Sequence, residues 1–565
     1  MAPPARAQVI TSSAQDPRVG LRGGWRDAAE IGRNMVLVAH RDRPDGFFTP
    51  GDPGAFPTAN SDLAFMGNTL VQGSFHGFQI WDISNPMAPS LRLAFPCPGG
   101  QGDPSVYRNL LFISVEQPTG RLDCGANGDT AATIPTANRF RGVRIFDISD
   151  IQHPRQVAAI QTCRGSHTHT LVADPNDPNN VYIYVSGSAP PRPAAELAGC
   201  SGEQPEKDPN TSLFSIDIIR VPLNAPQQAR VVASPRIFAN ESGNIAGLLR
   251  PVIDTSLAHH PSETNRCHDI TVYSAIGLAA GACAGNGIVL DIRNPANPKR
   301  VAAVSDSNFA FWHSATFNNG GDKIIFTDEW GGGTRAKCTA TDDPHWGADA
   351  LFTLRGNKLS PASYYKLPAA QTEFENCVAH NGSLIPIPGR DIFVQAWYQG
   401  GVSVVDFTDI AHPKEIAFFD RGPVDSTKIF LAGEWSAYWY NGHIYGSEIS
   451  RGLDVFGLQP SSFLTQNEID AAKTVHLDIL NAQNQQRIIW PPSFALSRAY
   501  LDQAIRSNAI PETGANFYWR SLEGAEKLNG AARARALRAI AARARLGRSS
   551  LRTFSNSVRD LSNLR

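Results

Sequence analysis

The chain has 565 residues, and its 51 Lys and Arg nearly balance 52 Asp and Glu, giving a net charge of −1. This balance excludes a whole-chain nucleic-acid binder, which would carry a basic surplus, and no run approaches the roughly 18 apolar residues of a membrane span. With 42% hydrophobic residues, 48 Gly and 40 Pro, the composition indicates a packed globular chain rich in turns.

Residues 1–33 are interpreted as an N-terminal arm. They begin MAPPARAQ and lack the apolar stretch of a signal peptide, but Ala5-Arg6-Ala7 has the small-x-small pattern at which such peptides end. We therefore expect the mature form of an exported protein, secreted or held in the periplasm or cell envelope.

One phrase recurs along the chain: a small residue, an alternating β-branched run, Asp, and a Pro-containing turn. Each copy is typical of a β-strand that ends at an Asx/Pro turn and leads into another strand, and a hairpin precedes each copy. The seven copies occupy residues 77–89, 142–154, 213–226, 287–298, 351–361, 401–413 and 452–460, the fifth and seventh being degenerate. The pattern therefore predicts seven units of four antiparallel strands.

Seven such sheets arranged radially make an all-β, seven-bladed β-propeller, which we place at residues 34–460. The last copy is followed by a helix start, so its outer strand is missing there, but the run NMVLVAH at 34–40 can supply it. An N-terminal strand in that position would close the ring and remove its free edges. The alternative is a pair of sandwiches of three or four repeats each.

Eight cysteines without any CxxC pair argue against a zinc ribbon and favour four disulfides in an oxidising compartment. The simplest of the possible pairings is sequential: Cys97–Cys124, Cys163–Cys200, Cys267–Cys283 and Cys338–Cys377. Eight reduced, buried cysteines in a cytosolic protein are the alternative.

Residues 461–565 are interpreted as a C-terminal α-helical extension, opened by a Thr465/Glu468 capping box. This extension carries 15 Lys and Arg against 8 Asp and Glu, whereas the other 460 residues carry 36 against 44. A basic extension could dock on the acidic remainder, an anionic polymer or lipid headgroups, or simply be a solvated appendage.

The repeats of the form G-x-x-I-x-D-I-S-x-P resemble those of the LVIVD-repeat proteins, a family of mostly exported bacterial chains. Beyond the repeats, segments such as SHTHTLV (166–172), CHDITVY (267–273) and NCVAHNGSLIP (376–386) resemble the actinobacterial-type branch. The resemblance spans roughly residues 34–500. It implies a propeller and export, and no agreed biochemical activity.

Four histidines fall at equivalent positions when the hairpins are aligned on the residue before the first turn: His167, His268, His313 and His380. In a propeller these positions open the innermost strand, beside the central channel. His169 lies two residues from His167, so an extended strand would present both on one face.

Converging imidazoles are typical of a transition-metal site, with copper or iron favoured and zinc as a further choice. Asp103 occupies the matching position in another unit; in the last unit that position is Ser436, and Glu434 lies two residues before it on the same strand face. Asp103 and Glu434 could act as ligands or as acceptors that orient the imidazoles. The alternatives are a ring of structural histidines that holds waters, or an anion site when protonated.

Two functions follow. The first is a metal-dependent oxidoreductase whose small-molecule ligand enters the central channel beside aromatic residues. The second is a non-catalytic extracellular interaction module, in which the insertions at 117–140, 186–210 and 235–265 and the basic extension capture an envelope component. No nucleic-acid partner and no membrane span are expected, and no GxSxG, HExxH or GxGxxG motif is present.

Overall fold

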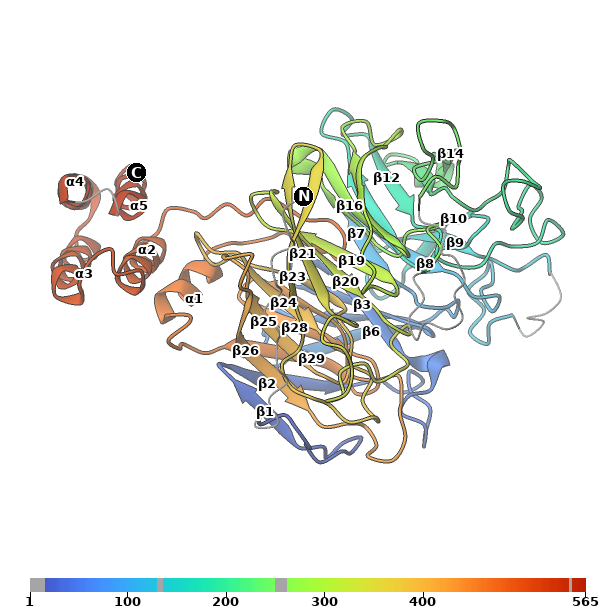
Figure 1. Cartoon of the computed structure of the whole chain (residues 1–565), viewed down its shortest axis with the longest axis horizontal. Helices are drawn as coiled ribbons and strands as arrows, with labels where there is room; N and C mark the ends of the chain where they lie inside the picture. The colour runs from blue at the N-terminus through green and yellow to red at the C-terminus, as the bar shows by residue number, and fades with distance from the viewer. Residues whose placement is uncertain (1–15, 130–135, 249–261, 548–550, 565) are drawn as a thin grey trace.

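The computed structural model describes residues 16–129, 136–248, 262–547 and 551–564 (Figure 1). The chain is mostly β, with a small group of helices near its C-terminus, as the sequence predicts. No helix in these ranges is both long enough and apolar enough to cross a membrane.

Five sheets each contain four consecutive strands paired antiparallel in chain order. The strands are β3 (Asn60–Met66), β4 (Thr69–Ser74), β5 (Gly77–Asp82) and β6 (Ser90–Pro96); β7 (Pro104–Tyr107), β8 (Leu110–Val115), β9 (Gly142–Asp147) and β10 (Arg155–Gln161); β11 (His169–Ala173), β12 (Asn180–Val185), β13 (Asp217–Pro222) and β14 (Arg230–Ala233); β15 (Ile270–Tyr273), β16 (Leu278–Cys283), β17 (Asn286–Asp291) and β18 (Lys299–Val304); and β19 (Trp312–Phe317), β20 (Lys323–Asp328), β21 (Asp349–Arg355) and β22 (Lys358–Tyr365).

A nine-stranded sheet contains two further groups of four, joined where β23 pairs parallel with β27. One group is β23 (Asn381–Ile385), β24 (Ile392–Ala396), β25 (Val402–Asp406) and β26 (Lys414–Arg421), with β1 (Glu30–Arg33) added at its edge; the other is β27 (Glu434–Tyr440), β28 (His443–Glu448), β29 (Gly452–Leu458) and β2 (Met35–Asp42). The N-terminal strand β2 thus supplies the outer strand beside β29, as expected from the sequence.

The repeated Asp ends the third strand of its group and fixes the turn that follows. Its carboxylate accepts the backbone N–H two residues on, as Asp82 does from Ser84 (2.9 Å) and Asp147 from Ser149 (3.0 Å). Asp291 and Asp406 form the same Asx turn. Every pairing of a third with a fourth strand also contains one register shift, including β29 with β2.

The first strands of successive groups contact one another at six of the seven junctions, and a hydrogen bond links the two groups at the seventh. β3 contacts β7, β11 contacts β15, and the series continues through β19, β23 and β27 back to β3. Between β7 and β11 the link is a hydrogen bond from the His169 N–H to Asp103 (3.1 Å). Apolar side chains of neighbouring groups fill the space between sheets, so each group buries both of its faces.

The eight cysteines form the four sequential disulfides: Cys97–Cys124, Cys163–Cys200, Cys267–Cys283 and Cys338–Cys377. The predicted pairing is confirmed.

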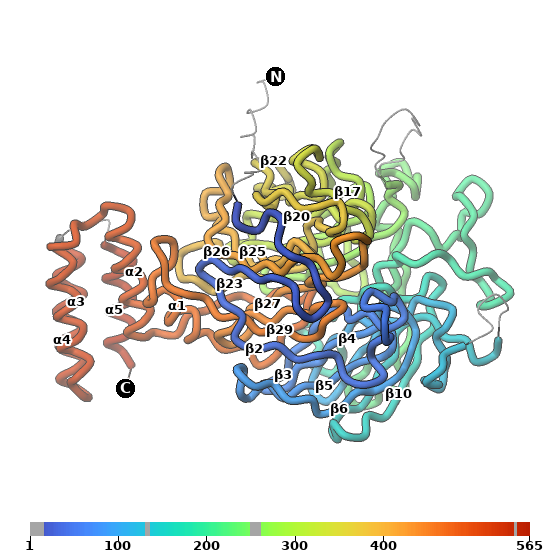
Figure 2. The backbone as a smooth tube through the Cα atoms, turned by 90° about the horizontal axis from the view of Figure 1, so that it is seen from below, coloured from blue at the N-terminus to red at the C-terminus, as the bar shows by residue number. Residues whose placement is uncertain are grey.

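The C-terminal region is only partly helical. After α1 (Gln466–Lys473), capped by Thr465 and Glu468 as predicted, residues 477–490 run back against the β region, and β30 (Ile479–Asn481) pairs with β3. The Asn481, Asn484 and Gln485 side chains in this segment donate to backbone carbonyls of three first strands. The remaining helices pack around a core of their own, beside the β region (Figures 1 and 2). They are α2 (Phe494–Arg506), α3 (Glu512–Glu526), α4 (Gly530–Gly547) and α5 (Arg552–Leu561).

Candidate metal centre

Four of the predicted histidines meet where the first strands begin. His167 Nε2 lies 2.8 Å from His268 Nε2. The imidazole of His268 is 3.9 Å from that of His313, and His313 is 4.2 Å from His380, centroid to centroid. The alignment of hairpins therefore identified side chains that converge, although they come from four separate strand groups.

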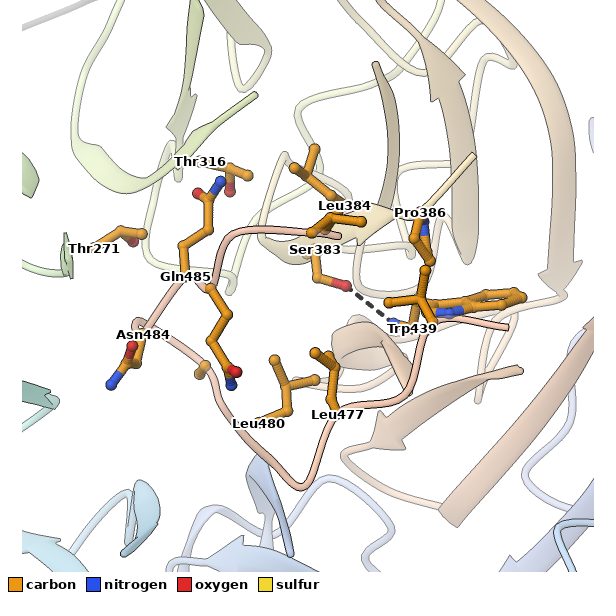
Figure 3. Close-up of a pocket in the computed structure, with 15 residues that line it drawn as sticks. Thr271, Thr316, Ser383, Leu384, Pro386, Trp439, Leu477, Leu480, Asn484 and Gln485 are labelled. Carbon is orange, nitrogen blue, oxygen red and sulfur yellow. Dashed lines mark hydrogen bonds between the residues drawn. The ribbon is translucent and has the colours of Figure 1, made fainter. Parts of the chain in front are cut away.

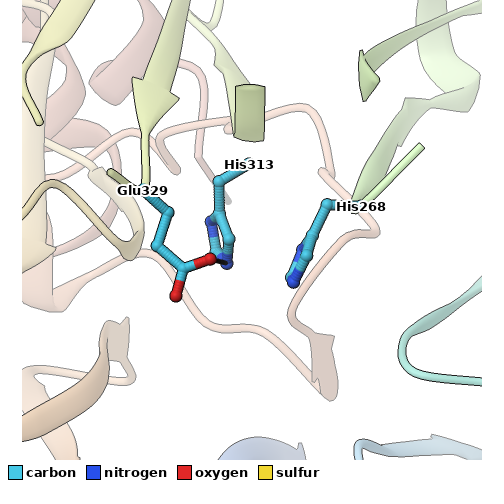
Figure 4. A group of neighbouring side chains, drawn as sticks. All are labelled: His268, His313 and Glu329. Carbon is cyan, nitrogen blue, oxygen red and sulfur yellow. Dashed lines mark ion pairs between the residues drawn. The ribbon is translucent and has the colours of Figure 1, made fainter. Parts of the chain in front are cut away.

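A carboxylate that the sequence analysis did not select completes the cluster. Glu329 follows β20, and its oxygens lie 3.7 Å from His313 Nε2 and 3.9 Å from His380 Nε2. One ligand atom from each of His268, His313 and Glu329 lies within 4.8 Å of the other two (Figure 4). All three side chains are buried.

Several of these polar atoms are buried without a hydrogen-bond partner: both nitrogens of His313, and Nε2 of His380. Leaving a buried polar group unpaired costs about 1–3 kcal/mol, so a cluster of them indicates a missing partner. Two imidazoles and a carboxylate are a donor set that transition metals accept.

Neighbouring groups hold the candidate ligands in place. Asp269 Oδ1 lies 3.0 Å from His268 Nδ1, which leaves Nε2 of that ring to face the cluster. The Tyr398 hydroxyl donates to Glu329 Oε1 (2.6 Å), and the Trp435 carbonyl accepts from His380 Nδ1. Carboxylate and carbonyl acceptors of this kind orient the histidine ligands of metal sites.

The electrostatics keep the inner imidazoles neutral. Burial lowers the pKa of His380 to about 3 and that of His313 well below its usual range, and it lowers the pKa of His268 as well. Burial raises the pKa of Glu329 to about 7. A neutral imidazole offers a nitrogen lone pair that can bind a metal cation, so these rings are in the protonation state that a metal site requires.

His167 is different because it has its own carboxylate. Although burial opposes protonation, Glu116, whose Oε2 is 2.7 Å from His167 Nδ1, raises the pKa of this histidine. His167 therefore lies at the border of the cluster, where its contact with Glu116 favours the protonated form more than in the other histidines.

His169 and Asp103 lie close to each other and apart from the Glu329 group. His169 Nδ1 is 2.8 Å from Ser114 Oγ and 3.4 Å from Asp103 Oδ2. Burial, together with the negative charge of Asp62, raises the pKa of Asp103 well above its usual range. The period of two predicts that His169 shares the channel-facing side with His167, but the His169 ring bonds to Ser114 and does not join the other imidazoles.

Glu434 is also directed elsewhere. It begins β27, and burial beside Asp454 and Glu448 raises the pKa of its carboxyl group well above the ordinary value. The residue of β27 that aligns with the histidines is Ser436, and a register shift between Glu434 and Ser436 interrupts the alternation that would place both side chains on one face.

One signal for the overlooked residues is present in the sequence. Three second strands are followed by or end in Glu, at Glu116, Glu329 and Glu448, so an acidic residue recurs at one level of the fold. Tyr398 has no such signal. Its backbone adopts φ 53°, a conformation that aromatic residues rarely occupy and that is typical of functional sites.

The opposite end of the first strands is covered by residues 477–490, which we call the C-terminal plug. It hydrogen-bonds to Val106, Leu171, Val272 and Phe317, each in a different first strand, and to Pro386 and Asn441, which follow two more. Between the plug and β19, β23 and β27 lies a small apolar pocket lined by Leu384, Trp439, Leu477 and Leu480 (Figure 3).

No protein-family model and no curated protein sequence matches the chain. Among solved structures, the periplasmic gluconolactonase of Pseudomonas aeruginosa is similar at 11% identity and a TM-score of 0.41, covering 68% of this chain and 88% of that one. Hydrazine synthase of Kuenenia stuttgartiensis is similar at 11% identity and a TM-score of 0.42, covering 73% and 98% respectively. Similarity at this level says nothing about the activity of this chain.

Proposed function

We propose that the chain is an exported seven-bladed β-propeller that binds one transition-metal ion at His268, His313 and Glu329 and acts as a metal-dependent oxidoreductase. The blade count rests on seven groups of four strands that share one bulge pattern and on links between neighbouring groups at all seven junctions, six by contact of first strands and one by a hydrogen bond. Export is supported by the four disulfides, and membership of the LVIVD-repeat family by the repeats themselves.

The observation that carries the metal proposal is the meeting of two neutral imidazoles and one carboxylate within 4.8 Å, with buried nitrogens that lack partners. His380 lies close enough to be a further ligand, and His167 borders the group. Two histidines and one carboxylate with open positions are the donor set of non-haem iron(II) sites. We therefore propose iron first, with copper as the second redox-active choice; zinc, which the same donors accept, would support binding without redox chemistry.

Metal analysis of the purified full-length protein tests the proposal. After incubation with Fe(II), Cu(II) or Zn(II) and removal of excess ion, we expect one ion per chain for at least one metal. His313→Ala and Glu329→Gln should each lower the bound metal to below about a tenth, because each removes one of three donors. His153→Ala, in an exposed turn, is the matched control and should retain full loading.

Two results would contradict the proposal. Loading below one ion per chain with every metal, or full loading of His313→Ala, would contradict the proposed metal site. A bound ion that cannot be reduced and reoxidised in a redox titration would contradict the proposed oxidoreductase activity and support a protein that binds metal without redox chemistry.

A further inference from the structure

A pocket of about 440 Å³ opens directly onto the histidine cluster. His268, Glu329 and His380 line its inner end, and Tyr398 lies beside them. Its volume falls within the range of about 300–1,000 Å³ that is usual for small-molecule sites.

The wall of this pocket is mostly aromatic. Phe56 and Phe75 lie 4.4 Å apart, Phe75 is 6.3 Å from Trp435, and Trp435 is 5.1 Å from the His380 ring. Phe56 is 47% exposed although it is a large apolar residue, which places an uncovered aromatic ring in the pocket. Such a wall favours a ligand with a flat apolar body.

Among the described residues that line the pocket, Arg266 is the one with a permanently cationic side chain. The Arg266 guanidinium lies 5.6 Å from the centre of the Phe311 ring, and Phe311 lies 5.7 Å from the His268 ring, so one aromatic residue separates Arg266 from the cluster. Its side chain donates to Asn265 Oδ1 (3.2 Å), and no carboxylate of the described ranges lies within ion-pairing distance.

The carboxylates in the pocket are already engaged. Glu116 is paired with His167, and Glu329 accepts from Tyr398. Outside the proposed metal site, the described wall therefore offers a cationic ligand no unpaired carboxylate, whereas an anionic ligand would find Arg266. Guanidinium groups bind carboxylates with two parallel hydrogen bonds.

We propose that this pocket binds a planar aromatic molecule bearing one carboxylate, with the carboxylate on Arg266, the rings against Phe311 and Trp435, and the far edge of the molecule directed at the histidine cluster. This deepens the proposed function by naming a substrate class for the same site. The binding itself requires Arg266 and the aromatic wall, and no metal.

Calorimetric titration of the full-length protein with 2-naphthoate, 2-naphthamide and 2-naphthylmethylamine tests this assignment. The expected result is binding of 2-naphthoate in both metal-free and metal-loaded protein, weakened about tenfold or more by Arg266→Gln and partly restored by Arg266→Lys. The affinity for the neutral 2-naphthamide should be the same in wild type and Arg266→Gln. Arg155→Gln, an exposed residue outside the pocket, should leave 2-naphthoate binding unchanged.

The inference is overturned if Arg266→Gln binds 2-naphthoate as tightly as wild type, if the amine binds more tightly than the carboxylate, or if binding depends on metal and not on Arg266. Metal content measured in the same samples separates the two proposals. Arg266-dependent binding in a protein that takes up no metal would contradict the proposed metal-dependent function and support the aromatic carboxylate site. Full metal loading without any 2-naphthoate binding would contradict the aromatic carboxylate site and leave the proposed metal site supported.

Discussion

At the scale of single residues, the site depends on Tyr398 as much as on its candidate ligands. The hydroxyl of Tyr398 donates to Glu329, and its ring lies 4.5 Å from that of His380. The left-handed backbone at this position costs about 1–3 kcal/mol in other contexts, so surrounding contacts must maintain it. Burial raises the pKa of Glu329 to about 7 even though the Tyr398 hydrogen bond lowers it, so loss of this donor would raise the pKa further.

Tyr398→Phe should therefore lower the affinity for the bound metal by about 10- to 100-fold, the usual effect of removing a group that orients a ligand. The measurement is a competition titration with a chromophoric chelator, alongside near-UV circular dichroism to check the fold. Tyr365→Phe removes another buried hydroxyl that donates to a carboxylate, Glu415, away from the cluster, and should leave the affinity unchanged. Equal affinities in the two variants would show that Tyr398 does not support Glu329.

At the scale of elements, the C-terminal plug acts as a shared partner for strand ends. The Asn481 carboxamide pairs with both the N–H and the C=O of Val106 (2.7 and 2.9 Å). The Gln485 carboxamide does the same with Phe317 (3.0 and 2.9 Å). Each amide thus stands in for one residue of a neighbouring strand, and a segment without regular structure becomes part of the β region.

Because both backbone groups of Phe317 would lose their partner, Gln485→Ala should lower the free energy of unfolding by about 1–3 kcal/mol. Gln486→Ala is the matched control, since the Gln486 side chain bonds only to Ile479 within the plug. Urea denaturation followed by tryptophan fluorescence gives both values. If Gln485→Ala and Gln486→Ala unfold at the same urea concentration, the plug does not stabilise the strand ends.

At the scale of the whole molecule, patterns of neighbouring residues predicted most of the fold, whereas contacts between distant segments were harder to predict. The Asx turns and the strand groups could be predicted because each depends on a few adjacent residues, and the pairing of β2 with β29 could be predicted because the last group lacks an outer strand of its own. The convergence of four histidines followed from their equivalent positions. The recurring Glu after second strands marks Glu329 as a candidate, but its place beside His313 and the role of the plug could not be predicted, because both depend on which strand ends meet across the fold.

The closure of the β region by its N-terminal strands is the remaining whole-molecule feature, and it depends on a buried network of charges. Asp454 of β29 accepts from Arg421 of β26 (2.9 Å) and lies 2.5 Å from His40 Nδ1 of β2, while Arg421 also pairs with Glu30 of β1 (2.7 Å). Burial lowers the pKa of His40, but the hydrogen bond and negative charge of Asp454 raise it more, giving a net increase.

A histidine whose pKa is higher in the folded state stabilises that state fully below the unfolded value of about 6.5, and this contribution is lost as pH rises through the folded pKa. Each unit of difference corresponds to about 1.4 kcal/mol. We therefore expect His40→Gln to unfold at lower denaturant than wild type at pH 6, with the difference shrinking as the pH rises to 8 and above. His153→Gln, in an exposed turn, controls for the loss of one imidazole. A difference between His40→Gln and wild type that stays constant or grows with pH would show that the His40–Asp454 pair does not hold β2 in place.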